Sequence, residues 1–336
     1  MYSCHSSVKF YVLAYLLTIH KSCKLSTLRT IFEAEAETRI LPLCMTSLRR
    51  LKSAFCRYRF KIVRSVETIQ CAINPGLYSQ VEELAKQFHT AMPFPHIVID
   101  DFLTEPIARE LFKDFPSISE MRRSNHYLFA NKYELPEWQQ ISNSFSLFHQ
   151  EITSDLFRQF INNVVGEDSL IDPEFCGDPQ QGRDRGFLDM HVDFNLHPRN
   201  QTWHHHLNVL IYLNDSWQPQ YGGDLELRLG LQGEISSISP AFNRCVIMLS
   251  DDTTYHGYKR LSLPDDMTRK AILVHGYKVE THQQLSRTLT SFAPYKNSVT
   301  KLGLVYLYNF VSSTKGRFFG SSLANKKEPF KPSDHP

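Results

Sequence analysis

The chain has 336 residues, of which 42% are hydrophobic and 12% aromatic, and its formal net charge is +2. This composition supplies enough apolar side chains for a sizeable core and excludes a collagen-like or wholly disordered chain. An uninterrupted apolar run of about 18 residues is absent from the sequence, which disfavours a conventional membrane span. The length predicts one large domain or two modest ones.

The near-neutral total hides an uneven distribution of charge. Residues 1–65 carry a net charge of +9 and residues 296–336 carry +5, whereas residues 66–295 carry −12. Such asymmetry is typical of a globular unit flanked by interaction segments. The acidic centre also makes nucleic acid an unfavourable partner for this unit.

These charge boundaries suggest three regions. We expect a basic N-terminal extension over residues 1–70, a central domain over residues 71–290 and a basic C-terminal extension over residues 291–336. Five of the seven cysteines lie in the first 71 residues and no CxxC pair occurs, so a zinc ribbon is disfavoured. Cys176 and Cys245 are too few for a disulfide scaffold in the centre, which favours a reducing, cytoplasmic location.

The N-terminal extension contains two distinctive stretches. Residues 10–19 are apolar, but only Lys9 precedes them closely and no small-residue cleavage site follows, so a secretory signal peptide is disfavoured. Residues 45–65 contain seven Lys or Arg and no acidic residue. We interpret them as a solvated leader, with peripheral membrane contact or nucleic-acid binding as alternatives. A further alternative is that translation begins at Met45, which would remove the first stretch.

The next part of the chain predicts helices around one strand. Apolar residues recur at helical spacing over residues 77–91, which predicts an amphipathic helix. Residues 93–103, PFPHIVIDDFL, predict a strand, because the prolines oppose a helix and the β-branched residues favour a sheet. Thr104 is expected to cap a helix over residues 105–115, and residues 137–165 predict one or two more helices.

From about residue 186 the pattern changes to short β-rich runs between turn signals. The runs are FLDMHVDF, HLNVLIYLN, GGDLELRL, RCVIMLS and RKAILVHGY. Five strands at this spacing without a long helix between them predict a β-sandwich or barrel.

The strand-like run around residue 191 carries a candidate metal site. In a strand, residues i and i+2 point to the same face, so His191 and Asp193 present an imidazole and a carboxylate together. His256, between two other strand-like runs, supplies a second imidazole. Two histidines and one carboxylate form the facial ligand set of non-haem Fe(II) oxygenases. The alternative is that these three are ordinary polar residues at a barrel rim.

A candidate anion-binding site lies on other predicted strands. Arg269 opens the last of them, and a buried arginine can grip a carboxylate through two parallel hydrogen bonds. Lys270 is the adjacent alternative, but strand alternation places it on the opposite face. Asn208 and Tyr212 share one face of their strand, from which the tyrosine hydroxyl can reach the same carboxylate.

Several of these stretches occur in the order and spacing of a known family. They are HVDFN at 191–195, LNVLIYLNDSWQPQYGGDLEL at 207–227, SPAFNRCVIM at 239–248, YHG at 255–257 and TRKAILVHGY at 268–277. Together with PFPHIVIDDFL, they resemble the 2-oxoglutarate/Fe(II)-dependent dioxygenases of the prolyl 4-hydroxylase-like superfamily, in particular its bacterial members. The resemblance covers about residues 93–280.

This resemblance implies an α+β fold with a double-stranded β-helix (jelly-roll, cupin-like) core and flanking N-terminal helices. It implies an enzyme that uses Fe(II), 2-oxoglutarate and O₂, with ascorbate as an accessory reductant, and that hydroxylates its substrate while releasing succinate and CO₂. The implied iron ligands are His191, Asp193 and His256. The residues implied to bind 2-oxoglutarate are Arg269, Tyr212, Asn208 and Leu225, with Arg269 at the distal carboxylate.

Three further features are a glycine turn, the residues before the HxD motif and a run of histidines. Gly222 and Gly223 are expected to form a tight turn, with Trp217 packed under it. The tyrosine that some prolyl hydroxylases place before the HxD motif has no counterpart in GRDRGFLDM, which puts a prolyl substrate in doubt. The three histidines at 204–206 are interpreted as a solvated loop at the rim, with substrate contact as the alternative.

The substrate therefore stays open between a protein side chain, such as prolyl, and a small molecule or sugar. Two other function classes are weighed against the dioxygenase. A catalytically silent β-helix used as a binding module is disfavoured because the ligand set and Arg269 are complete. A zinc-dependent hydrolase could use the same three ligands, but it has no use for Arg269.

Overall fold

The computed structural model describes residues 71–124, 129–279, 287–293, 303–305 and 307–311. The expected N-terminal extension, with its apolar and basic stretches, lies outside the described residues, as do residues 312–336. Cys176 and Cys245 are free thiols. None of the helices in the described part of the chain has the length and apolar character needed to cross a bilayer.

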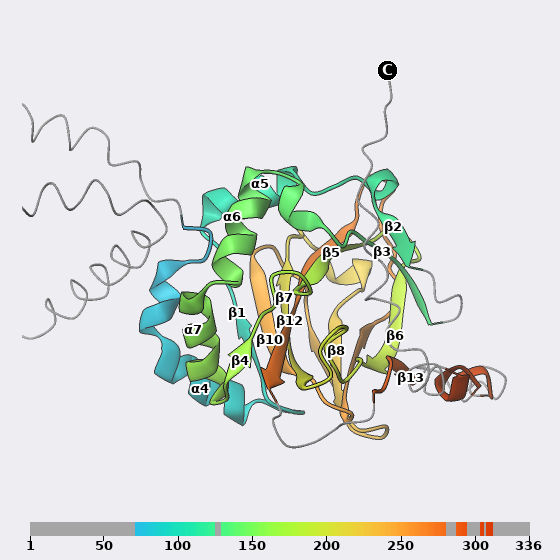
Figure 1. The fold of residues 1–336 in the computed structure, drawn as a ribbon. Coiled ribbons are helices and arrows are strands. Elements are labelled where there is room, and N and C mark those ends of the chain that lie inside the picture. Colours follow the sequence, from blue (N-terminus) through green and yellow to red (C-terminus); the bar gives the residue numbers. More distant parts are fainter. Residues whose placement is uncertain (1–70, 125–128, 280–286, 294–302, 306, 312–336) are drawn as a thin grey trace, which may run out of the picture. The chain divides into compact units, whose positions relative to one another are not determined.

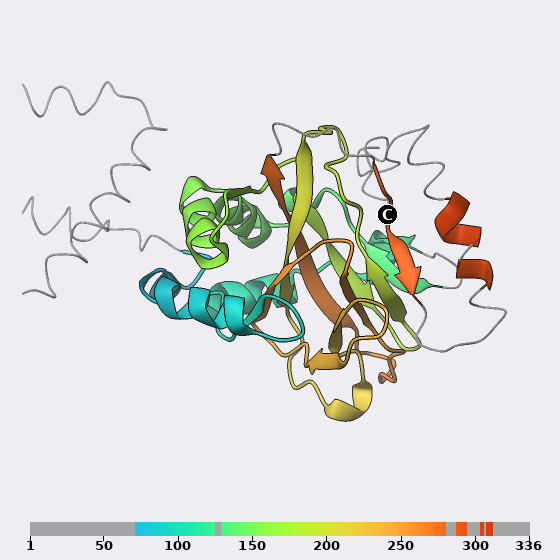
Figure 2. The ribbon, with the colours of Figure 1, turned by 90° about the horizontal axis from the view of Figure 1, so that it is seen from below.

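Four α-helices precede most of the strands and lie on one side of them (Figure 1 and Figure 2). They are α4 (Val81–Thr90), α5 (Glu105–Lys113), α6 (Asn143–Ile152) and α7 (Asp155–Val165). Short 3₁₀ turns cover Pro75–Ser79, Ile118–Glu120, Trp138–Gln140 and Pro219–Tyr221. In α7 the local signals agree: Ser154 caps the first turn through Phe157 N, and Gly166 ends the helix with a positive φ of 77°.

The described strands are mostly short and all their pairings are antiparallel. They are β1 (His96–Ile99), β2 (Arg122–Ser124), β3 (Ala130–Glu134), β4 (Ser169–Leu170), β5 (Gly177–Gly182), β6 (Phe187–Val192), β7 (Trp203–Tyr212), β8 (Leu225–Leu229), β9 (Ile235–Ile238), β10 (Arg244–Leu249), β11 (Thr254–Tyr258), β12 (Arg269–Val279) and β13 (Ser291–Ala293).

The strands form two layers of one curled sheet. The first layer runs β1-β10-β7-β12-β5 and the second runs β6-β11-β8-β9, while β3 pairs with both β5 and β6 and so joins them. β13, from the expected C-terminal extension, pairs with β6. This arrangement confirms the predicted α+β fold with a double-stranded β-helix core and N-terminal helices.

Strand alternation divides the apolar residues of the first layer between two cores. Val209 and Ile211 in β7 face the helices, together with Ile272 in β12. Leu210 and Tyr212 face the second layer, where they pack in an inner core with Leu225 and Leu227 of β8 and Ala271 of β12. The odd-numbered residues at the start of β12, including Arg269, therefore face the interior between the two layers.

Most predicted elements are present, with two differences. Strands β6, β7, β8, β10 and β12 correspond to the five predicted β-rich runs. Thr104 is the N-cap residue of α5, but its hydroxyl donates to Cys71 O at 2.8 Å instead of accepting from the helix. The interpretation of residues 204–206 as a solvated loop is wrong, because pairing with β12 extends β7 back to Trp203 and buries His205 and His206.

Candidate active site

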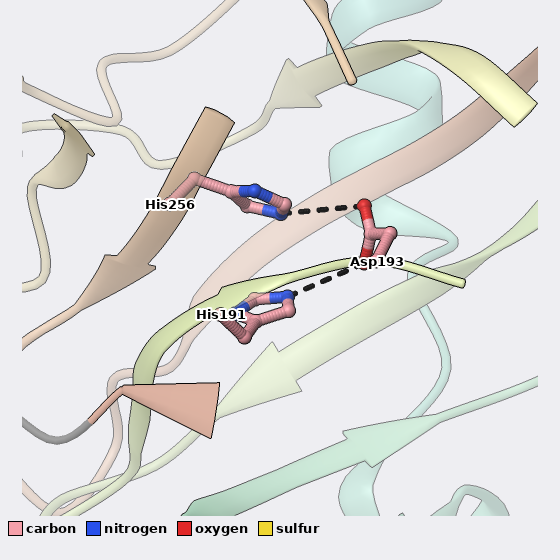
Figure 3. A group of neighbouring side chains, drawn as sticks. All are labelled: His191, Asp193 and His256. Atoms are coloured by element: carbon pink, nitrogen blue, oxygen red, sulfur yellow. Dashed lines mark ion pairs between the residues drawn. The ribbon is translucent and has the colours of Figure 1, made fainter. Parts of the chain in front are cut away.

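Three predicted ligands meet at the ends of two neighbouring strands of the second layer. His191 in β6 is the direct partner of His256 in β11, and Asp193 follows the end of β6. One nitrogen or oxygen from each of the three side chains lies within 4.8 Å of the others (Figure 3). The structure thus brings together the three residues that the sequence predicts as metal ligands.

Both imidazoles turn the same nitrogen toward the carboxylate. His191 Nε2 lies 3.4 Å from Asp193 Oδ1, and His256 Nε2 lies 3.5 Å from Asp193 Oδ2. His191 Nδ1 donates to Asp189 O at 3.0 Å, which leaves the Nε2 lone pair directed toward the group. This orientation suits ligation of a cation by Nε2.

Burial determines the charge state of this group. Burial and the neighbouring His191 lower the pKa of His256 to about 3, so its imidazole is neutral at neutral pH. Burial opposes ionisation of Asp193, but the adjacent imidazoles outweigh it and hold its pKa well below the usual range. A carboxylate beside two imidazole rings is the donor set expected for a divalent cation such as Fe(II).

Asn208 lies beside the metal-ligand candidates, away from the predicted anion site. Its side-chain amide donates to Asp193 Oδ2 at 2.6 Å. Behind it, inside the barrel, His205 Nε2 and His275 Nδ1 each lie 3.1 Å from Asn208 Oδ1. Burial lowers the pKa of His205 and lowers that of His275 to about 3. The sequence did not indicate this contact of Asn208 with Asp193, and the contact of Asn208 with a cosubstrate stays a prediction.

The second cluster surrounds the buried Arg269 at the start of β12. Its guanidinium carbon lies 4.1 Å from the centroid of the Tyr258 ring and 5.0 Å from that of Tyr212. Its Nε donates to Gly223 O at 2.7 Å. Among the described residues, Arg269 forms no ion pair with a carboxylate. The cation therefore suits an anionic ligand.

Tyr212 points to the same conclusion. Its side chain is fully buried, and its hydroxyl has no hydrogen-bond partner among the described residues. Burial raises the pKa of this hydroxyl, and the nearby Arg269 opposes the shift. Because buried polar groups are normally paired, the hydroxyl is a further contact available to a ligand at Arg269. Leu225 packs in the same inner core and can supply an apolar wall.

The turn before β8 makes room for this arginine. Gly222 and Gly223 both have positive φ, 66° and 73°, as the predicted tight turn requires. A Cβ on Gly223 would collide with the Leu261 side chain and lie 3.0 Å from Arg269 Cδ. The predicted packing of Trp217 under the turn is also present, since its indole nitrogen donates to Gly222 O at 3.1 Å.

Lys270, the adjacent cation, points away from the interior. Its ammonium group donates to Thr268 Oγ1 at 2.7 Å and lies 5.1 Å from the centroid of the Phe112 ring, on the helical side. This agrees with the predicted alternation along the strand. Tyr258, by contrast, was missed by the sequence reasoning, although its position two residues after His256 places it on the same face of β11.

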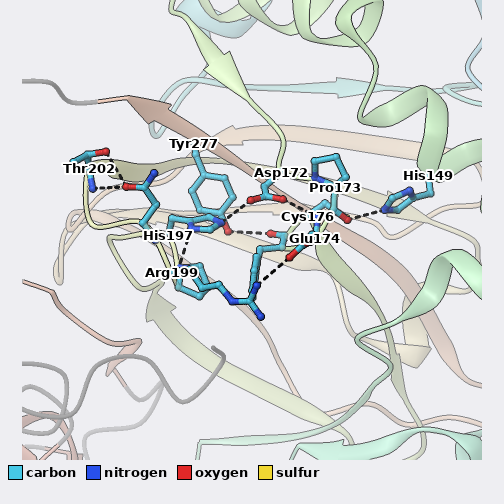
Figure 4. A network of polar contacts seen from close by, with 12 residues as sticks. His149, Asp172, Pro173, Glu174, Cys176, His197, Arg199, Thr202 and Tyr277 are labelled. Atoms are coloured by element: carbon cyan, nitrogen blue, oxygen red, sulfur yellow. Dashed lines mark hydrogen bonds and ion pairs between the residues drawn. The ribbon is translucent and has the colours of Figure 1, made fainter. Parts of the chain in front are cut away.

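The chain that leaves Asp193 is held by a polar network at the rim (Figure 4). His197 Nε2 lies 3.0 Å from Asp172 Oδ2, and the adjacent Arg199 pairs with Glu174 at 3.1 Å. The His197 ring also packs edge-on against Tyr277, with 4.7 Å between ring centroids. His197 is thus a buried anchor between the loop after β6 and the loop after β4.

Comparison with known proteins identifies this barrel. Residues 180–275 match the model of the 2OG-Fe(II) oxygenase superfamily, a range that runs from β5 to β12 and includes the metal-ligand candidates and Arg269. Residues 180–275 thus correspond to a 2OG-Fe(II) oxygenase domain. The oxygenase is accordingly an enzyme that uses Fe(II) and 2-oxoglutarate. The His, Asp, His group fits the metal, and Arg269, which has no carboxylate partner among the described residues, fits the cosubstrate.

Solved structures with a similar fold include prolyl hydroxylases. The oxygenase is 17% identical to a prolyl-4-hydroxylase of Pseudomonas putida, covering 61% of this chain and 98% of that one, with a TM-score of 0.44. It is 16% identical to a prolyl hydroxylase of Trichoplax adhaerens solved with a peptide of hypoxia inducible factor, covering 60% and 91%, with a TM-score of 0.47.

A third similar structure is HygX of Streptomyces hygroscopicus, solved with nickel and 2-oxoglutarate. It is 14% identical, and the match covers 62% of this chain and 90% of that one, with a TM-score of 0.42. No curated protein sequence matches the chain significantly. Since all three TM-scores are below 0.5, the assignment of an oxygenase domain rests on the superfamily match of residues 180–275.

Proposed function

We propose that this oxygenase is a hydroxylating dioxygenase in which His191, Asp193 and His256 hold Fe(II) and Arg269 holds 2-oxoglutarate. The observation that carries the proposal is the pairing of two features inside one barrel. One is a complete ligand group, and the other is a buried cation with an unpaired tyrosine hydroxyl beside it. A zinc hydrolase would use the first feature and leave the second without a role.

In this mechanism the protein mainly binds and orients. The imidazoles of His191 and His256 and the ionised Asp193 would hold the Fe(II) with which 2-oxoglutarate and O₂ react. Arg269 grips the distal carboxylate of 2-oxoglutarate, Tyr212 donates to the same carboxylate, and Leu225 excludes water from its side. When bound, iron and 2-oxoglutarate supply the oxidative chemistry that releases succinate and CO₂ and hydroxylates the substrate.

The proposed substrate is a protein side chain, such as prolyl, or a small molecule or sugar. We assign the oxygenase domain to residues 71–290, with basic extensions over 1–70 and 291–336, and we propose a cytoplasmic location with ascorbate as accessory reductant. The prolyl option is supported by the sequence resemblance, and weakened by the missing tyrosine before the HxD motif. A silent binding module is not favoured, because the ligand group is complete.

The test uses the full-length protein. Succinate release from 2-oxoglutarate is measured with and without Fe(II), across prolyl peptides, free amino acids and sugars, and binding of 2-oxoglutarate is measured by calorimetry. We expect Fe(II)-dependent succinate release that one substrate class stimulates. Binding of metal and 2-oxoglutarate without succinate release would support the binding module instead, and a failure to bind either would contradict the proposal.

A further inference from the structure

A polar network lies behind Asp193, on strands that supply no metal-ligand candidate. Asn208 in β7 is the direct partner of His275 in β12, and both belong to the first layer, whereas Asp193 follows β6 of the second. The Asn208 amide therefore reaches across the interior to the carboxylate at 2.6 Å. This contact joins the two layers at the position where the candidate ligands meet.

A β-bulge brings a second histidine into this network. In the pairing of β7 with β12, Leu207 opposes Gly276 but His205 opposes Tyr277, so His206 is an extra residue in β7. His206 points outward and contacts the Ser169 hydroxyl at 3.0 Å, while His205 turns inward, three residues before Asn208. Bulges of this kind re-aim side chains near active sites.

The chemistry of each atom determines which groups of the network donate hydrogen bonds and which accept them. Asn208 Nδ2 must face the carboxylate, because its carbonyl oxygen would be repelled there, so Oδ1 is an acceptor. His205 Nδ1 lies 3.0 Å from Phe194 O and must donate to it. In a neutral His205 the Nε2 atom is then an acceptor. His275 Nδ1, 3.1 Å from both His205 Nε2 and Asn208 Oδ1, supplies the one N–H that both share.

We propose that Asn208 and His275 are positioning residues for Asp193, and that His205 fixes the positions of the His275 and Asn208 side chains. This inference rests on the proposed role of Asp193 as an iron ligand. His275 donates to the Asn208 carbonyl, which locks the amide so that its NH₂ group donates to Asp193. His205 stacks on Phe194, the next residue after Asp193, with ring centroids 4.8 Å apart. The network thus restricts both the side chain and the backbone at this position.

Restricting the carboxylate matters because Asp193 lies beyond the end of its strand. Without a partner the side chain can rotate away, and each fixed rotamer has an entropic cost that metal binding must overcome. Partners of metal ligands are commonly worth about 10–100-fold in metal affinity. Asn208 and His275 therefore contribute to metal binding although neither is predicted to touch the metal.

The test measures metal affinity separately from turnover. Co(II) is titrated into the full-length protein without 2-oxoglutarate, and binding is followed by calorimetry and by the visible spectrum of the bound ion. Asn208→Leu and His275→Leu, which remove the hydrogen bonds, should each weaken Co(II) binding about 10–100-fold and change the spectrum. His275→Asn, which places an N–H near the position of Nδ1, should stay within about threefold of the wild type.

A matched control lies next in sequence to this network. His206→Gln alters a buried histidine of β7 that faces away from the carboxylate, and it should leave Co(II) affinity unchanged. Thermal unfolding of each variant checks the fold, and Asn208→Ala replaces Asn208→Leu if the larger side chain prevents folding.

Each outcome separates this inference from the proposed function. Wild-type Co(II) affinity in the folded Asn208 variant, or equal losses in His206→Gln, overturns the inference while the metal site stands. If His275→Asn loses as much Co(II) affinity as His275→Leu, the role of the shared N–H is overturned. Absence of Co(II) binding in the wild type overturns the metal site itself, and this inference with it.

Discussion

The two ends of the barrel interior differ in how completely the chain satisfies their polar groups. At the metal end, Asp193 is hydrogen-bonded to Asn208, which in turn contacts His275. At the arginine end, Arg269 has no carboxylate partner among the described residues, and the buried hydroxyl of Tyr212 has no partner either. The polar groups of the first end are thus paired within the protein, whereas those of the second leave contacts that the proposed anion would use.

The largest expected effect comes from removing the carboxylate at the metal end. Asp193→Ala should reduce Fe(II)-dependent succinate release to background, because two imidazole ligands alone hold the ion weakly. The loss of metal affinity, measured by calorimetry, should exceed the roughly 100-fold upper value for partners of ligands. Asp100→Ala, which removes a carboxylate paired with Arg244 outside this site, is the control. Retained metal affinity in Asp193→Ala would show that the metal end is misassigned.

The next effect separates the two ends. Arg269→Ala should weaken 2-oxoglutarate binding by about 30-fold to several thousand-fold, since truncating one partner of a buried charge pair commonly costs about 2–5 kcal/mol. Metal affinity should be unchanged, because Arg269 contacts none of the three ligands. Lys270→Ala is the matched control, as its side chain points to the helices. Equal affinity for 2-oxoglutarate in Arg269→Ala and the wild type would refute the anion site.

A smaller effect tests the unpaired hydroxyl. Tyr212→Phe should weaken 2-oxoglutarate binding about tenfold, and it should raise the free energy of unfolding of the ligand-free protein by about 1 kcal/mol. The opposite signs follow because the hydroxyl is buried without a partner until an anion is bound. Tyr277→Phe provides the contrast: its hydroxyl donates to Phe175 O at 3.0 Å, so its loss should lower stability and leave 2-oxoglutarate binding intact. A destabilised Tyr212→Phe would contradict the prediction.

The pH dependence of stability sharpens the comparison further, because His256 and His275 lie toward the metal end of the interior. Burial lowers the pKa of His206 to about 4 and those of His256 and His275 to about 3, against 6.5 in the unfolded chain. Above pH 6.5 these histidines are neutral in both states. As the pH falls below 6.5 the unfolded chain binds protons that the folded chain excludes, so the free energy of unfolding decreases.

The expected slope is about 1.4 kcal/mol per pH unit for each histidine. Urea unfolding of the metal-free protein between pH 7 and pH 5 measures it. His206→Gln should reduce the slope by the contribution of one histidine, about 1.4 kcal/mol per pH unit. A slope that does not change in this variant would mean that His206 is protonated equally in both states.

The sequence predicted the strands whose local pattern matches their burial. β7, β10 and β12 have β-branched or apolar runs of the required length, and their residues pack in the two cores. β5 was missed because its sequence, GDPQQG, contains glycine, proline and glutamine, which read as a turn. It is a strand because it pairs with β12 along six residue pairs, which is a tertiary interaction.

The site shows the same division between local and distant determinants. His191 lies in β6 and Asp193 directly follows its last residue, so their convergence could be predicted from a spacing of two residues in extended backbone. The inward turn of His205 could not, because it depends on a bulge that only the pairing of β7 with β12 reveals. The absence of a partner for Tyr212 is likewise a property of the packed interior.

The short strand β3 has a consequence for how the oxygenase responds to its ligands. It joins the layers through only two residue pairs with β5 and two with β6, whereas β7 and β12 share nine. The metal-ligand candidates belong to one layer, and Arg269 and Tyr212 belong to the other. A ligand bound to both the metal and Arg269 would therefore link the two layers, which β3 joins through few residue pairs. Its binding should slow amide hydrogen exchange in β3.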